Sequence, residues 1–381
     1  MTKIIALYLP QFHPIPENDH WWSPGFTEWT NVAKAKPLFR GHYQPRIPAD
    51  LGFYDLRVPE TREQQAQMAK EAGIEAFCYY HYWFAGHQLL ERPFNEVVAS
   101  GKPDFPFCLC WANHTWSSAT WTASGKGSSI LIEQTYPGEE DDIKHFYNLL
   151  QAFRDPRYYK IDGKLVFCIY DVWGFPQVTQ FIERWQKLAQ AHHLPGFYFI
   201  GMTPNTLSFT IDKEGNHKTI IPNLKHSADI YNSVLDMGFD AVNSFGKRRG
   251  EILSRGVLLN MVQRFLELRH INIFAHTYDY PSTVKGFFAP EDAWENVFPT
   301  IMPQWDRTAR NANREGIYIN SSPENFRIHI QDALRLLKSK QTEHQVLFLK
   351  SWNEWAEGNY VEPDLKFGHR YLHILKEINN Y

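Results

Sequence analysis

Two glutamates near the C-terminus carry the side chains best suited to chemistry. Glu354 and Glu357 lie three residues apart, with Trp352 before them and Trp355 between them. The apolar run Val346–Lys350 precedes them and predicts a strand that delivers both acids to its C-terminal end. Paired carboxylates suit glycosidic-bond chemistry, because one group handles the leaving oxygen and the other handles the opposite side of the sugar. The flanking aromatic rings offer flat apolar surfaces to a pyranose.

The spacing of the two glutamates constrains their geometry. In an ideal strand they would face opposite sides, because side chains alternate. Both reach one pocket only if the chain leaves strand geometry near Trp355, and Gly358 could relax such a turn. On a helix the same spacing gives a solvated acidic pair on one face, and this alternative stays open. If the carboxylates are close, repulsion raises one pKa, and that group could act as a general acid near neutral pH.

Short apolar runs predict the elements that position these acids. The runs are continuous rather than alternating, which indicates strands buried on both faces, as in a parallel sheet. They are Ile4–Leu9, Ala76–Tyr82, Phe105–Trp111, Leu165–Tyr170, Phe197–Met202, Ala241–Phe245, Thr300–Gln304 and Val346–Lys350. Helix-like segments lie between runs, at Glu60–Ala72, Gly138–Phe153, Gln177–His192, Ile252–His270 and Asn325–Lys338. This alternation predicts an α/β fold, a (β/α)8 TIM barrel in which residues 1–381 form a single catalytic domain.

The chain is longer than a barrel needs. It has 381 residues, whereas a typical barrel has about 250, so long loops are expected at the C-terminal face. The candidate loops are Gln11–Leu56, Asn113–Tyr136, Thr203–Met237 and Gly246–Phe298. Residues 212–216 predict a turn in a surface excursion, and no linker or internal repeat marks a second domain.

Polar and aromatic residues gather after the predicted strands, where the active site of such a barrel lies. The candidate substrate-binding residues are Tyr8, Gln11, Glu28, Trp29, Tyr80, His81, Trp111, Asn113, Asp171, Gln304, Trp305 and Asn353. In the loop after the first strand, Glu28 could bond sugar hydroxyls, although a surface loop fixed by its own aromatic residues fits equally well. Asp171 has a turn cap as its alternative. Tyr80, Trp111 and Trp305 could stack on a sugar, and a place in the hydrophobic core is an equally good interpretation of each.

Composition and motifs exclude several other classes. With 43% hydrophobic and 21% charged residues and a net charge of −3, the chain fits a globular protein without a nucleic-acid surface. No run is long enough for a membrane span or a signal peptide, so a cytoplasmic location is expected, or a periplasmic one if a leader was removed. The four cysteines fall in apolar runs and are expected to be buried, reduced thiols. No metal, phosphate or dinucleotide motif occurs, so no cofactor is expected. The oligomeric state stays open.

Four segments resemble a known family. Tyr8–His13, Phe26–Val32, Cys78–Trp83 and Trp352–Gly358 closely resemble the WbsX-type proteins of bacterial polysaccharide gene clusters, and the resemblance extends over nearly the whole chain. These proteins are often labelled glycosyltransferases, yet they are similar to glycoside hydrolase family 99, the endo-α-mannosidases. The likeness to family 99 is remote and rests mainly on the Asn-Glu-Trp-x-Glu-Gly motif and the barrel.

The resemblance implies roles for the two acids. Family 99 enzymes have a (β/α)8 barrel and retain the anomeric configuration without a carboxylate attacking the sugar. By position, Glu354 would deprotonate the sugar 2-hydroxyl, which closes on C1 as a 1,2-anhydro intermediate, and Glu357 would act as acid and then as base. Ala356 stands where the mannosidases tend to have a larger polar residue, which leaves the pair intact and the sugar open.

Three hypotheses follow from the residues and the resemblance. The first is a retaining glycoside hydrolase, mannosidase-like and with endo action as one option, on a bacterial or host oligosaccharide or polysaccharide. The second is a glycosyltransferase in the biosynthesis of a surface polysaccharide such as O-antigen or capsule. The third is a non-catalytic barrel that binds glycans.

Overall fold

The computed structural model describes residues 2–118, 129–205, 209–211, 217–219, 226–256, 258–259, 261–262, 265, 276–311 and 316–378. The turn predicted at residues 212–216 lies outside these residues. Parts of three predicted loops also lie outside them, namely those at Asn113–Tyr136, Thr203–Met237 and Gly246–Phe298.

Eight parallel strands form a closed barrel. They are β1 (Lys3–Tyr8), β2 (Ala76–Phe84), β4 (Phe107–Trp111), β8 (Lys164–Ile169), β9 (Phe197–Pro204), β12 (Ala241–Phe245), β14 (Val297–Ile301) and β16 (Val346–Leu349). Neighbouring strands follow chain order, and β1 pairs with both β2 and β16, which closes the sheet. The predicted (β/α)8 fold is therefore confirmed. The seventh strand starts at Val297 rather than Thr300 and ends before Pro303, which has no N–H to donate to a ladder.

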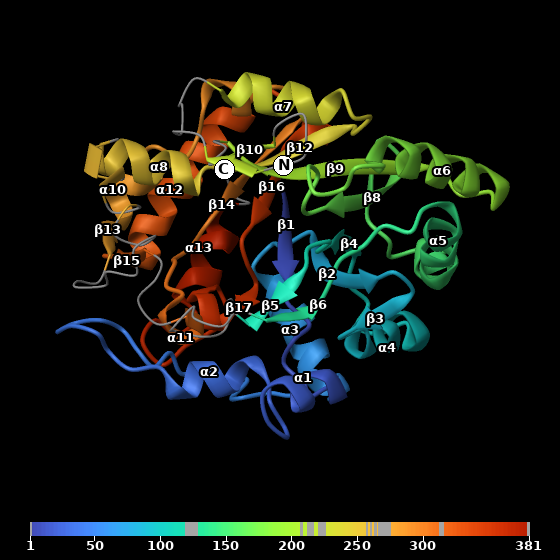
Figure 1. Cartoon of the computed structure of the whole chain (residues 1–381). Coiled ribbons are helices and arrows are strands. Elements are labelled where there is room, and N and C mark those ends of the chain that lie inside the picture. Colours follow the sequence, from blue (N-terminus) through green and yellow to red (C-terminus); the bar gives the residue numbers. More distant parts are fainter. Residues whose placement is uncertain are drawn as a thin grey trace.

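Helices cover the outside of the barrel, with α5 and α6 on one side of the view in Figure 1 and α8, α10 and α12 on the other. The longer ones are α3 (Pro59–Glu71), α4 (Arg92–Ser100), α5 (Glu139–Phe153), α6 (Val178–Ala191), α7 (Ser227–Leu235), α8 (Lys247–Arg255), α12 (Pro323–Leu337) and α13 (Arg370–Ile378). Four of the predicted helices match α3, α5, α6 and α12 closely. The helix predicted at Ile252–His270 begins earlier, as α8, and residues beyond Gly256 are described only in part. Among the described helices, none is both long and apolar enough to cross a bilayer.

Smaller elements decorate the barrel. The helical ones are α1 (Pro16–Trp21), α2 (Glu28–Lys34), α10 (Tyr280–Val284), α11 (Thr308–Asn311), η2 (Pro290–Ala293), η3 (Thr342–His344) and η4 (Trp355–Glu357). The strands are β3 (His87–Leu89), β5 (Trp116–Ser117), β6 (Ile130–Ile132), β7 (Lys160–Ile161), β10 (Phe209–Ile211), β11 (His217–Thr219), β13 (Thr277–Asp279), β15 (Ile317–Ile319), β17 (Asn353–Glu354) and β18 (Asn359–Tyr360). In Figure 1 the arrow of β1 runs toward the end of the molecule that carries α1 and α2.

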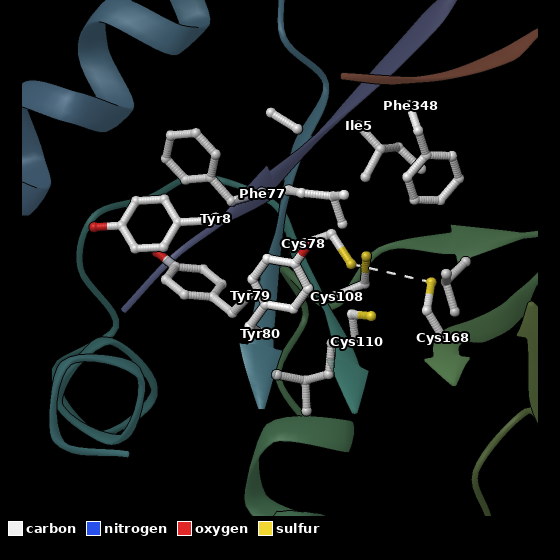
Figure 2. Packing of buried hydrophobic residues seen from close by; sticks show 14 of the residues in the cluster. Ile5, Tyr8, Phe77, Cys78, Tyr79, Tyr80, Cys108, Cys110, Cys168 and Phe348 are labelled. Carbon is white, nitrogen blue, oxygen red and sulfur yellow. Dashed lines mark hydrogen bonds between the residues drawn. The ribbon is translucent and has the colours of Figure 1, made fainter. Parts of the chain in front are cut away.

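Side chains of β2 alternate between the barrel interior and the surrounding helices. Figure 2 shows Phe77 and Tyr79 on one side of the strand and Cys78 on the other, where it meets cysteines of β4 and β8. The Sγ atoms of Cys78 and Cys168 lie 4.0 Å apart. All four cysteines are free and buried, as the sequence predicts. Burial raises the pKa of the Cys78 thiol well above its usual value, which keeps it in the neutral form.

Candidate active site

The chain leaves strand geometry where the two glutamates occur. The barrel strand β16 ends at Leu349, Glu354 closes the short strand β17, and the 3-10 turn η4 ends at Glu357. Gly358 follows with a φ of 56°, and a Cβ atom there would lie 2.9 Å from the Arg46 Nε. The turn that the sequence requires near Trp355 is therefore present. It brings both carboxylates to one cavity, where they are only 5% and 6% exposed rather than solvated on a helix.

This candidate catalytic cavity lies at the C-terminal ends of the barrel strands. It encloses about 880 Å³, part of which is open to solvent. Aromatic rings, three cations and the two glutamates form its wall. The lining residues are Leu9, Gln11, Tyr80, Tyr82, Ala112, His114, Trp116, Tyr170, Phe245, Trp305, Arg307, Arg310, Lys350, Glu354 and Glu357. Flat apolar rings beside charged groups are the features that a sugar-binding cleft needs.

Each glutamate has its own cationic partners. The Nη1 of Arg310 donates to Glu357 Oε1 at 2.6 Å, and the Nε of Arg307 lies 3.0 Å from the same oxygen. The Nζ of Lys350 donates to Glu354 Oε2 at 3.1 Å and to the Tyr80 hydroxyl at 3.3 Å. Charge-assisted hydrogen bonds of this kind fix the positions of both carboxylates in a mostly buried site.

These partners drive the pKa values of the two carboxyls apart. Burial raises the pKa of Glu354, and the neighbouring Glu357 carboxylate adds to the rise. Burial also acts against ionisation of Glu357, but the guanidinium groups of Arg307 and Arg310 outweigh it and help lower that pKa to about 2. Two carboxyls of which one has a raised pKa and the other a lowered pKa form the arrangement expected of an acid–base pair. The direction, however, is opposite to the roles that the family resemblance implies, because Arg307 and Arg310 keep Glu357 ionised.

Glu28 supports the site from behind. Its carboxylate is 1% exposed and accepts a hydrogen bond from the Nη2 of Arg310 at 2.7 Å, so Arg310 bridges Glu28 and Glu357. Among the described residues, the second oxygen of Glu28 has no hydrogen-bond partner. Burial raises the pKa of Glu28 to about 7, although the Arg310 charge opposes the rise. Glu28 does not line the candidate catalytic cavity, so its observed role is to hold Arg310 from behind.

The indoles of the motif are structural. Trp352 and Trp355 are fully buried and donate their Nε1–H groups to Glu362 at 2.9 and 2.6 Å. Gln65 and Tyr54 donate two further bonds to the same carboxylate. The interpretation that these two indoles offer their faces to a pyranose is therefore wrong. They bind the motif to a buried acid instead.

Three of the predicted substrate-binding residues line the cavity, namely Gln11, Tyr80 and Trp305. The Nε2 of Gln11 donates to the Tyr82 hydroxyl at 2.8 Å. The Nζ of Lys247 lies 4.7 Å from the centroid of the Trp305 ring. These three are the sequence candidates that the structure brings to the glutamates.

Several other candidates point out of the barrel, because strand residues alternate in direction. The Tyr8 hydroxyl donates to Gln65 of α3 at 2.7 Å. The Nε2 of His81 lies 2.7 Å from the Nε2 of His145 of α5. The Trp111 indole is 2% exposed and donates to the carbonyl of Trp83.

Three other candidates connect loops. The Asn113 Oδ1 accepts from the backbone N–H of Asp171 at 2.7 Å, and Asp171 in turn caps the N–H of Gly174 at 2.9 Å. Asn353 bonds both the N–H and the carbonyl of Leu9, at 2.7 and 3.0 Å. These side chains are used to hold the cavity's walls together.

Two further candidates are also held away from the cavity. The Gln304 amide bonds Arg46 and the carbonyl of Tyr360. The Trp29 indole donates to the carbonyl of Tyr54 at 2.8 Å and packs against Trp355. They support the loop that carries the two glutamates.

The cations of the cavity were not among the sequence candidates. Lys350 ends the apolar run that predicts the last barrel strand, and a lysine at that position is a usable signal. Arg307 and Arg310 follow Trp305 closely, beyond the seventh strand. Their spacing alone carries no signal, because α11 must first turn them toward Glu357. Among the described residues, no group of three or more His, Cys, Asp or Glu side chains could hold a metal ion.

A closed parallel barrel with buried carboxylates at its mouth is the architecture of glycan-acting (β/α)8 enzymes. Residues 4–375 match the family described as glycosyltransferase WbsX, and the chain belongs to that family. The chain is 32% identical over 380 residues to the uncharacterized protein WxcX of Xanthomonas campestris pv. campestris strain B100, and equally to that of strain ATCC 33913. The alignment covers 99% of this chain but 49% of either relative, so the chain spans about half the length of the curated relatives it matches.

Solved structures support the fold. A glycoside hydrolase-like protein shares 18% identity with a TM-score of 0.58, covering 99% of this chain and 93% of its own. The family 99 endo-α-mannosidase from Bacteroides thetaiotaomicron shares 13% identity with a TM-score of 0.50, covering 98% and 95%. At these identities the likeness shows a common barrel and leaves the substrate to be determined.

Proposed function

We propose that the chain is a single catalytic domain, a retaining glycoside hydrolase that cleaves a bacterial or host oligosaccharide or polysaccharide. The observation that carries this proposal is the pair Glu354 and Glu357 in the wall of one cavity, with pKa values driven in opposite directions. Glycosidic cleavage needs one protonated and one ionised carboxyl on the same sugar. The ring-lined cavity gives the sugar a place to bind.

The reaction would form a 1,2-anhydro sugar by attack of the substrate's own 2-hydroxyl on C1. One carboxylate takes the proton of that hydroxyl, and the other carboxyl protonates the leaving oxygen. Water then opens the anhydro ring with net retention. The family resemblance makes Glu354 the base and Glu357 the acid, whereas burial and the neighbouring cations favour Glu354 as the proton donor.

Leaving-group dependence separates these two assignments. A glycosyl fluoride needs little acid assistance, so a variant that lacks the acid keeps activity on α-mannosyl fluoride and loses it on a glycan. A variant that lacks the base loses both. The activities of Glu354→Gln and Glu357→Gln on the fluoride are therefore compared. In a second experiment, the wild type and Glu357→Gln are screened in parallel against a glycan library for new reducing ends. The proposal fails if Glu357→Gln keeps full activity on a glycan that the wild type cleaves.

The family description favours a second candidate, a glycosyltransferase in surface-polysaccharide biosynthesis. A transferase of this kind would bind a nucleotide sugar, and the described residues contain no metal-binding cluster to hold its diphosphate. Calorimetry with a panel of nucleotide sugars, with and without Mg²⁺, decides between the candidates. Tight metal-dependent binding would favour the transferase. A cytoplasmic location stays a prediction for either candidate.

A further inference from the structure

A second cavity lies deeper in the barrel mouth and joins the catalytic cavity. It encloses about 620 Å³ and shares four wall residues with its neighbour, namely Tyr80, Tyr170, Phe245 and Lys350. Its other wall residues come from the interior of the strands or their ends: Leu7, Met202, Thr203, Pro204, Asn243 and Thr300. We call this cavity the inner pocket. A sugar held against the glutamates has the inner pocket directly beside it.

The polar groups of the inner pocket are bonded to one another. The Asn243 Nδ2 donates to the Thr300 hydroxyl and to the carbonyl of Phe298, both at 2.9 Å. The Thr203 hydroxyl donates to the carbonyl of Asn243 at 3.5 Å. These bonds use the donors of Asn243 and Thr203 within the wall, so fewer polar groups are left for a sugar hydroxyl.

Carbon and sulfur atoms form most of the rest of the inner wall, beside the polar residues Tyr80, Tyr170 and Lys350 that it shares with the neighbouring cavity. Leu7, Met202, Pro204 and Phe245 contribute apolar surface, and the first three are buried or nearly so. A hydroxyl moved from water into such a wall loses hydrogen bonds that the wall does not replace, whereas a methyl group gains contacts and loses nothing. The inner pocket is therefore matched to an apolar substituent.

Lys350 marks the junction between the two cavities. Its Nζ bonds Glu354 on one side and the Tyr80 hydroxyl on the other, and its side chain lines both spaces. A sugar ring that contacts Glu354 must pass a substituent beside Lys350 to reach the inner pocket.

We propose that the inner pocket binds a methyl group of the substrate, so that the substrate is a deoxy or N-acetylated glycan rather than a fully hydroxylated one. The methyl group is either C6 of a 6-deoxy sugar or the methyl of an acetamido group. The inference rests on the proposed function for the choice of a sugar as ligand. An apolar pocket discriminates against an added hydroxyl by about 10- to 100-fold, which sets the scale of the expected preference.

Binding to the wild-type protein tests this inference without catalysis. Methyl 6-deoxy-α-D-mannopyranoside and methyl α-D-mannopyranoside differ only in the oxygen at C6, and methyl 4-acetamido-4,6-dideoxy-α-D-mannopyranoside adds the acetamido methyl. Dissociation constants are measured by ligand-observed NMR titration of Glu354→Gln, which prevents turnover, and of the wild type. If the pocket takes C6, we expect both 6-deoxy glycosides to bind about 10-fold or more tightly than the mannoside. If it takes the acetamido methyl, we expect only the 4-acetamido-4,6-dideoxy glycoside to show this gain.

A pocket variant checks that the preference comes from the inner pocket. Met202→Gln keeps the side-chain length and adds an amide, so it should abolish most of the preference. Met68→Gln, on the outer helix α3, is the matched control and should preserve it. Equal binding of all three glycosides, tighter binding of the mannoside, or binding of none of them would overturn the inference.

The two proposals fail in different ways. If the protein prefers methyl-bearing glycosides but hydrolyses no glycan, the inference about the inner pocket stands and the hydrolase proposal fails. If the protein hydrolyses mannosides but shows no methyl preference, the hydrolase proposal stands and the inference about the inner pocket fails.

Discussion

Arg310 is the residue whose removal gives the sharpest test of the site's electrostatics. It is 9% exposed and donates to Glu357 at 2.6 Å and to Glu28 at 2.7 Å. Arg310→Met keeps much of the side-chain volume and removes the charge, which leaves two buried carboxylates without this partner. Loss of one partner of a buried ion pair costs about 3–5 kcal/mol.

The pKa of Glu357 gives a second scale, which includes the charges of Arg307, Lys350 and Lys247 as well as that of Arg310. The pKa of Glu357 falls from 4.5 to about 2 on folding, which corresponds to about 3 kcal/mol at about 1.4 kcal/mol per unit. A lowered pKa of an acid means that this stability is present above pH 4.5 and is lost as the pH falls toward 2. Glu28 changes the pH dependence of stability in the opposite direction. Its pKa is raised to about 7, so its contribution falls as the pH rises from 4.5 to 7.

Thermal unfolding at several pH values is the assay. For 381 residues, the entropy of unfolding is about 0.8 kcal/mol/K, so a loss of 3–5 kcal/mol lowers Tm by about 4–6 °C. We expect this difference at pH 7 to 8, where both glutamates are ionised in the unfolded chain, and a smaller one below pH 4.5. Arg335→Met is the matched control, because the Arg335 side chain is 68% exposed and its ion pair contributes little. An Arg310→Met difference that equals the control, or that does not change with pH, would refute the reasoning.

Three further outcomes are expected. Glu357→Gln should reduce turnover on a cognate glycan by orders of magnitude while far-ultraviolet circular dichroism stays close to the wild type, and its Tm should fall by about 4 °C because the charge paired with Arg310 is lost. Glu362→Gln weakens four hydrogen bonds from buried donors, including both motif indoles. It should destabilise the chain by about 1–3 kcal/mol in urea unfolding, and an unchanged midpoint would contradict the structural role of those indoles. Gly358→Ala forces a Cβ atom to 2.9 Å from Arg46 at a positive φ, so a loss of about 1–3 kcal/mol is expected in the same assay; a Gly101→Ala change, where φ is 71° and nothing lies within 4 Å, isolates the backbone part.

The barrel could be predicted because its strands are short, apolar and buried on both faces. Such runs stand out against the helices between them, and seven of the eight begin within two residues of their predicted start. The turn at Trp355 could also be anticipated, since two acids at that spacing reach one pocket only outside a strand. These features depend on nearby residues alone.

The direction of each polar side chain depends on register, which the sequence does not reveal. Tyr8, His81 and Trp111 occur near strand ends, yet all three face the helices. The Arg310–Glu28 contact joins positions separated by 282 residues, and only the folded barrel brings α2 and α11 together. Long-range pairing of this kind, and not the motif itself, determines which charges surround the two glutamates.

The seam where the barrel closes also has a consequence for synthesis. Strand β1 pairs with β16, and Asn353 bonds the backbone of Leu9 across the same seam, 344 positions away. A nascent chain on the ribosome can build β1 through β14 but cannot form the cavity until β16 and the loop after it have emerged. The first strand must therefore wait with an open edge, exposed to chaperones and to neighbouring nascent chains. Activity should appear abruptly, once β16 and the loop that carries Glu354 and Glu357 have left the ribosome, rather than grow with chain length.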